Sequence, residues 1–169
     1  MNVLTKDDAA EKMKVETLDS CLYQLSKRLL PAGTPFAIPP QSKAQTALAK
    51  FLAYLLLENS GVYVYLSRWS LHPSTEHLEL FYGYRRSVGE TRPLSEAPVH
   101  FMEPASRHEL ESVLCMVLFF GWEAWLFDET GNTLVRITND GKLEVRAEGQ
   151  TNIGAFAADP AKYFLAMAS

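Results

Sequence analysis

Cysteine, excess charge and long apolar runs are all scarce in this sequence, and each scarcity excludes a class of protein. The 169 residues include two cysteines, Cys21 and Cys115, so no disulfide framework is expected. Both lie in helical patterns beside apolar residues, which predicts reduced core thiols that react slowly; a catalytic or redox thiol is the alternative. The longest apolar run, 51–57, is interrupted by Tyr54 and is too short to cross a bilayer.

The charge balance is nearly even. Sixteen basic residues face twenty acidic ones, for a net charge of −4. A dedicated nucleic-acid binder needs Lys and Arg in excess, because its affinity comes mainly from neutralising phosphates. The N-terminal residues carry early acids and no apolar core, unlike a signal peptide. We therefore expect a soluble, cytoplasmic protein with neither nucleic acid nor membrane among its partners.

Motifs that carry catalysis or bind a cofactor are missing. No G-x-S-x-G elbow and no glycine-rich phosphate loop occurs. His72 and His77 match no established metal-ligand spacing, although a site combining them with Glu76 or Glu79 is an alternative. Turn chemistry explains Asp128 and Asp140. The sequence thus predicts no catalytic residues, no cofactor and no metal.

The clearest structural signal is a meander over residues 122–147. Three runs rich in β-branched and aromatic residues are joined by 129–132 and 139–141, where Gly, Asn and Asp suit tight turns. Gly141 is expected at positive φ. Alternating patterns also predict strands at 62–70 and 78–85 and a short edge strand at 98–103.

Helical spacing of apolar residues predicts helices from Leu18 to Leu29, over 42–59 and over 106–120, and Asp159-Pro160 is expected to start a terminal helix. We therefore predict a single α+β domain over residues 1–169. Its antiparallel sheet, formed by the meander 122–147 plus strands near 62–85, packs against amphipathic helices. Residues 1–15 carry a weaker pattern and are either a capped helix or a frayed extension.

Large aromatic residues recur on one face of the predicted strands. The residues that we predict to bind a partner are Tyr63, Tyr65, Trp69, Trp125 and Phe127. If helices cover only the other face, these rings stay open, and Tyr and Trp are common in protein interfaces. The alternative is that helices cover both faces and bury the rings.

Arginines are concentrated in a segment that the pattern predicts to end a strand and start a loop. Arg85 and Arg86, followed by Arg92, are candidates for binding an anion. The alternative is a solvated loop whose charge keeps an edge strand from pairing with another chain.

The segment FFGWEAWLFDETGNTLVRITNDGKLEV resembles small bacterial α+β domains, including immunity-type proteins that neutralise toxins by binding. The resemblance covers about the last third of the chain and implies no site residue. Our first hypothesis is a non-enzymatic protein that acts by protein–protein contact, or by self-association, through the aromatic face. The second is a small-molecule or anion-binding protein, or an enzyme, with a pocket between sheet and helices.

Overall fold

The computed structural model describes residues 1–31, 33–58, 60–69, 75–148 and 151–160. Its helices are α1 (Lys6–Met13), α2 (Leu18–Arg28), α3 (Ser42–Leu56), α4 (Thr75–Ser87), α5 (Arg107–Phe120) and α6 (Asn152–Ala158), with a 3-10 turn at Pro104–Ser106. Its strands are β1 (Asn2–Leu4), β2 (Leu30–Pro31), β3 (Phe36–Ala37), β4 (Val62–Arg68), β5 (Val99–Met102), β6 (Glu123–Asp128), β7 (Thr133–Ile137) and β8 (Lys142–Ala147). Within these ranges, no helix is long and apolar enough to cross a membrane.

All strand pairs are antiparallel, in the order β1-β5-β4-β6-β7-β8-β2, and β3 also pairs with β8. The predicted α+β class and the meander are confirmed: β6, β7 and β8 pair in sequence. Gly131 and Gly141 occupy its turns at φ 69° and 76°. β5 fulfils the predicted strand at 98–103, but it lies inside the sheet between β1 and β4, not at an edge.

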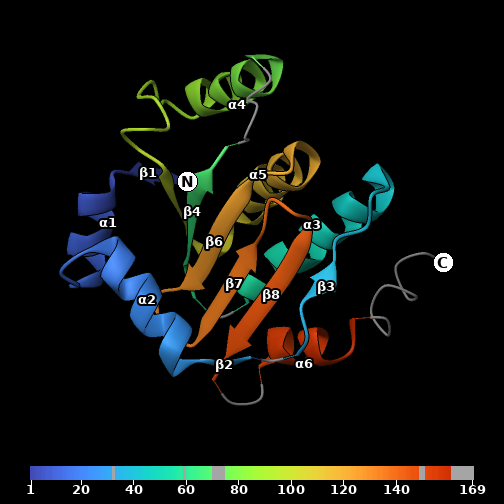
Figure 1. The fold of residues 1–169 in the computed structure, drawn as a ribbon. Helices are drawn as coiled ribbons and strands as arrows, with labels where there is room; N and C mark the ends of the chain where they lie inside the picture. The colour runs from blue at the N-terminus through green and yellow to red at the C-terminus, as the bar shows by residue number, and fades with distance from the viewer. Residues whose placement is uncertain (32, 59, 70–74, 149–150, 161–169) are drawn as a thin grey trace.

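Helices cover the sheet on both faces (Figure 1). On one face, α3, α5 and α6 form the larger core with the sheet. The five helical residues expected there are buried: Leu52, Leu56, Val113, Leu114 and Val117. On the other face, α1 and α2 pack on the β4 side of the sheet and form a second core.

The N-terminal residues belong to the fold and are not a frayed extension. β1 pairs with β5, and α1 begins at a capping box in which Thr5 and Asp8 each accept a hydrogen bond from the other's backbone N–H. Ala9 is fully buried in the second core. The expected cap therefore forms.

The strand predicted at 78–85 is wrong, because these residues lie within α4. An eight-residue apolar pattern is compatible both with the two-residue repeat of a strand and with the repeat of a helix. Here the helical repeat holds, because the buried residues are Phe81 and Arg85, four residues apart. Glu76 in the first turn and Arg85 and Arg86 in the last also suit the helix dipole. The residues expected in a terminal helix beyond Pro160 lie outside the described residues, whereas α6, capped by Thr151, was not predicted.

Candidate functional site

Three of the five predicted partner-binding aromatics are covered. Tyr63 and Phe127 are each 1% exposed and Tyr65 is 9% exposed. Tyr63 stacks on Phe127 with ring centroids 5.2 Å apart, and both belong to the core under α1 and α2. The expectation of an open surface at these three rings is therefore wrong, and the alternative of helices on both faces is what the structure has.

The other two predicted aromatics, Trp125 and Trp69, lie on opposite faces of the sheet. Trp125 remains half-buried on the same face as the three covered rings, with the guanidinium of Arg136 4.7 Å from its ring centre. Trp69 packs instead against the larger core on the opposite face. The register shifts between Leu66 and Arg68, and such a shift changes which face the following residues meet. The five residues thus form no single surface.

The predicted arginine pair is also separated. Arg85 is fully buried and donates from Nη2 to the Ala97 carbonyl at 3.0 Å. Arg86 is exposed, as consecutive positions of a helix point in different directions. Arg92 lies in the following loop and is paired with Glu90 at 2.6 Å. The structure does not bring Arg85 and Arg86 together around one anion.

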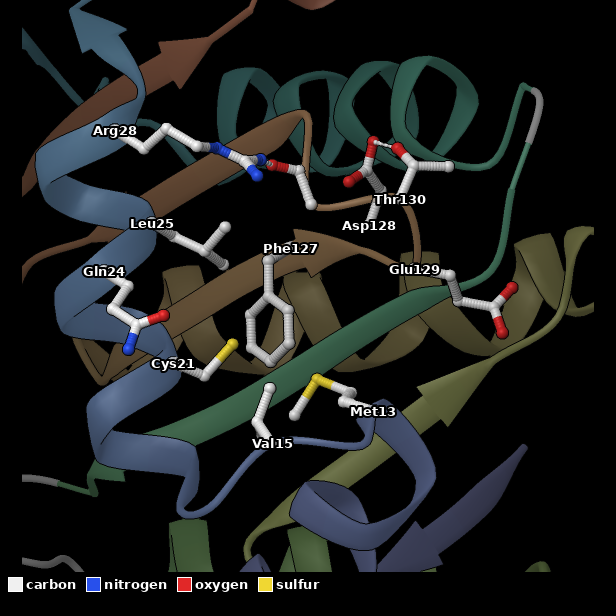
Figure 2. Close-up of a pocket in the computed structure, with 11 residues that line it drawn as sticks. Met13, Val15, Cys21, Gln24, Leu25, Arg28, Phe127, Asp128, Glu129 and Thr130 are labelled. Carbon is white, nitrogen blue, oxygen red and sulfur yellow. Dashed lines mark hydrogen bonds between the residues drawn. The ribbon is translucent and has the colours of Figure 1, made fainter.

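A different site lies between the sheet and the α1–α2 pair. It is a cleft of about 340 Å³ at the turn between β6 and β7, and we name it the α1–α2 cleft (Figure 2). Its lining residues are Met13, Val15, Cys21, Gln24, Leu25, Arg28, Phe127, Asp128, Glu129, Thr130 and Gly131. They come from two stretches of the chain, 13–28 and 127–131, that are far apart in the sequence.

The charged groups of the α1–α2 cleft are largely engaged within the protein. Asp128 accepts hydrogen bonds from the backbone N–H of Asn132 at 2.8 Å and from the Thr130 hydroxyl at 3.0 Å. Glu129 accepts from the Gly61 N–H at 3.0 Å and points away from the other lining residues. Arg28 donates to the Gly131 carbonyl. These bonds fix the β6–β7 turn and direct the Glu129 carboxylate away from the cleft.

The inner wall of the α1–α2 cleft is apolar and carries sulfur. Figure 2 shows the Cys21 thiol and the Met13 thioether on the side of the cleft where the Phe127 ring lies. Burial raises the pKa of Cys21, and nearby Arg28 only partly opposes this. Burial, with smaller contributions from Glu129 and Cys21, likewise raises the pKa of Tyr63 to about 12. At neutral pH the thiol and the phenol are therefore uncharged.

Gln24 supplies a polar side chain that can bind a ligand, because its amide makes no hydrogen bond among the described residues. It is exposed at the mouth of the α1–α2 cleft, on the same helical face as Cys21 and Arg28. Its amide carries both donors and acceptors. The cleft therefore combines an apolar wall with a neutral hydrogen-bonding group at its mouth.

No signal in the sequence could identify this cleft as a whole. The helical pattern does place Cys21 and Leu25 on the apolar face of α2, and the turn signal does place 129–132 between two strands. Their meeting depends on how α2 crosses the sheet, which no local pattern encodes.

The described residues contain no group of three His, Cys, Asp or Glu side chains that could hold a metal ion. His77 stacks on Phe120 with ring centroids 4.2 Å apart, and His72 lies outside the described residues. Asp128 and Asp140 occupy turns at opposite ends of β7.

No family model, curated protein or solved structure matches this chain.

Proposed function

We propose that this protein binds a small molecule in the α1–α2 cleft, with an apolar portion against the half-buried side chains of Met13, Val15 and Cys21 and a polar group at Gln24. The observation that carries the proposal is the cleft itself. Its volume of about 340 Å³ falls within the roughly 300–1,000 Å³ typical of ligand sites, which combine apolar walls with a few placed polar groups. The two free cysteines agree with a reducing compartment such as the cytoplasm.

Binding, and not catalysis, is the activity that this chemistry favours. The two carboxylates of the α1–α2 cleft are held by the turn or by Gly61. The raised pKa of Cys21 disfavours the thiolate that a nucleophile requires. The ligand that fits best is uncharged, because neither sign of charge is left free on the inner wall.

A screen of small neutral compounds by ligand-observed NMR tests this proposal. Hits should slow the labelling of Cys21 by a thiol reagent but leave Cys115 unaffected, since Cys115 lies on α5, outside the cleft. Gln24→Ala should weaken binding about fivefold to tenfold, the loss of one hydrogen bond. Gln41→Ala is the matched control, because Gln41 is exposed before α3 and makes no side-chain cap bond.

Two results would count against ligand binding in the α1–α2 cleft. One is a screen without a compound that protects Cys21. The other is a set of hits that bind the Gln24→Ala and Val15→Trp variants as tightly as the unmodified protein, since the added indole at Val15 would narrow the cleft.

A second candidate, contact between protein chains, is favoured by the part of the sheet face that lies beyond α2. Trp125, Arg136, Glu144 and Arg146 border a hollow of about 210 Å³ there, which Ser26 of α2 also lines. Arg136 pairs with Glu144 at 3.8 Å, whereas Arg146 has no ion pair among the described residues. Trp and Arg are enriched in interface centres, and a face with both charge signs can be complementary to itself in a two-fold dimer.

Sedimentation velocity over a wide concentration range tests this second candidate. Self-association should be concentration-dependent and should be lost in Trp125→Ala and in Arg146→Glu. Tyr54→Ala, an exposed ring on α3, should leave it unchanged. A monomer at every concentration would exclude self-association through this face. A dimer whose dissociation constant is unchanged by both substitutions would exclude it too.

A further inference from the structure

α4 is held to the rest of the protein by few buried side chains. Of its 13 residues, Phe81 and Arg85 are buried. Figure 1 shows the helix at the margin of the fold, where its remaining contacts include the Tyr84 hydroxyl, 3.3 Å from the Glu109 carbonyl. One of the two buried side chains of α4 is therefore a charged one, and Leu78, Tyr82 and Tyr84 add partly buried contacts with the larger core.

Arg85 has no ion pair with a carboxylate among the described residues, although its guanidinium lies 5.9 Å from the ring centre of Tyr82. Apart from the bond to Ala97, its Nε and Nη1 atoms are buried and have no hydrogen-bond partner among the described residues. The nearby carboxylate, Glu90, is bound by Arg92 through three nitrogen atoms, the backbone N and the side-chain Nε and Nη2. Arginine does not deprotonate in proteins, so a buried guanidinium without a paired carboxylate opposes the docking of α4.

His100 lies in the same buried region. It is fully buried on β5, neither ring nitrogen has a hydrogen-bond partner among the described residues, and its ring meets Phe81 of α4 edge-on at 5.7 Å. Burial first, and then the charge of Arg85, lower the pKa of His100 to about 3. The closed structure thus requires a neutral imidazole.

Among the charged groups near His100, Arg85 has the largest effect on the pKa of the imidazole. Its partners across the sheet are Val3 on β1 and Val64 on β4, neither of which carries a charge. Glu90, in the loop after α4, favours the protonated form, as does the backbone of Val64 and Pro98, though less than burial and Arg85 disfavour it.

Two titratable side chains of α4 lie at its contact with α5: Tyr84, and His77, which stacks on Phe120. Burial, with help from Glu109 of α5, raises the pKa of Tyr84 to about 12. Tyr84 is therefore an uncharged phenol throughout the range in which a histidine titrates.

We propose that α4 is a latch that opens when His100 takes up a proton. In the closed state, a protonated His100 would face the buried guanidinium of Arg85 without solvent. Opening hydrates both groups and exposes Phe81 and the ring of Trp122, which Phe81 covers at 5.1 Å. The buried indole N–H of Trp122, also without a partner among the described residues, gains water as well.

The opening equilibrium has a defined pH dependence. An exposed histidine has a pKa of about 6.5, whereas the closed state holds the pKa of His100 near 3. Between these values opening takes up one proton, so the opening constant rises about tenfold for each unit by which the pH falls. Above pH 7 the opening constant of α4 no longer depends on pH.

Hydrogen exchange followed by mass spectrometry between pH 4 and 7 tests the latch. After correction for intrinsic exchange rates, protection of α4 should fall about tenfold per pH unit, while β6 and β7 should remain protected. A constant protection of α4 would overturn the proposal. An equal loss in β6 and β7 would also overturn it, because the event would then be global unfolding.

Substitutions assign the proton to His100. His100→Leu should abolish the pH dependence of α4 protection, whereas His108→Gln should preserve it, since the side chain of His108 is 95% exposed. Arg85→Met should make opening rarer at every pH by removing the buried charge. A pH dependence that survives His100→Leu would refute the assignment.

Acrylamide quenching gives a second readout that does not depend on exchange rates. In a Trp69→Phe, Trp125→Phe background, Trp122 is the one remaining tryptophan. Its quenching should increase as the pH falls from 6.5 to 4 while the far-ultraviolet circular dichroism of the sheet persists. Unchanged quenching over that range would contradict the opening of α4.

Discussion

Tyr65 on β4 and Trp125 on β6 lie directly opposite each other in the sheet, and the edge of the helical cover runs between them. Tyr65 is buried, with the Lys6 ammonium 4.8 Å from its ring centre. Trp125 is only half-buried, and Arg136 lies against its ring. The aromatic face of this sheet therefore has a core part and a solvent-facing part.

The two parts should differ in their contribution to stability. Tyr63→Ala removes a ring that is 1% exposed and should cost about 3–5 kcal/mol, from lost burial and the cavity left behind. Trp125→Ala should cost about 1–2 kcal/mol, because it removes half-buried area and one cation–π contact. Urea unfolding of both variants checks this. Equal costs would mean that α1 and α2 cover the face differently.

Local chemistry explains which elements could be predicted. The turns of the meander carry glycines at the positions where positive φ is required, so Gly131 and Gly141 identified it without knowledge of the rest of the fold. For α4 the local signals conflicted. Leu78, Leu80, Tyr82 and Tyr84 alternate as in a strand, yet Leu80 is 61% exposed and the buried pair Phe81 and Arg85 follows the helical period.

The surfaces depended on packing that no local pattern encodes. Four of the five predicted aromatic residues share one sheet face and Trp69 lies on the other, but the sequence does not state that α1 and α2 return to cover most of the shared face. The α1–α2 cleft joins Cys21 and Gln24 to the β6–β7 turn about a hundred residues later. The position of such a site depends on where α2 crosses the sheet, and this is known only from the three-dimensional structure.

Two glycines offer a matched pair of alanine substitutions. Gly141→Ala should destabilise the protein by about 1–2 kcal/mol, because φ is 76° there and a side chain is disfavoured in that region. Gly83→Ala, inside α4, should stabilise by about 0.5–1 kcal/mol, since among the described residues the new Cβ meets only Arg86 Nη2, at 3.9 Å. Thermal midpoints should move in opposite directions. Shifts of the same sign would contradict one of the two backbone conformations.

The Glu90–Arg92 pair should contribute to acid sensitivity. Arg92 donates to Glu90 and lowers the pKa of that carboxyl to about 2, against about 4.5 when it is free. A lowered carboxyl pKa stabilises the folded state above the unfolded value, and the stabilisation is lost as pH falls from about 4.5 towards 2. Glu90→Gln should therefore show a weaker loss of stability over this range. Glu16→Gln, at an exposed position, is the control, and identical acid profiles for Glu90→Gln and the parent protein would rule out the contribution.

Arg85→Met should raise the stability of the protein at neutral pH. The substitution removes a buried charge that lacks a carboxylate partner and replaces it with an apolar side chain of similar length. It also removes the bond to the Ala97 carbonyl, and an unpaired buried acceptor costs about 1–3 kcal/mol. The desolvation penalty of a buried ion is several kcal/mol, so the gain should exceed the loss and leave a net stabilisation of about 1–3 kcal/mol. Arg86→Met, at the exposed neighbouring position, should change stability by less than about 0.5 kcal/mol. Chemical denaturation at pH 7 compares the two variants, and a destabilised Arg85→Met protein would mean that the guanidinium has a compensating partner in the folded state.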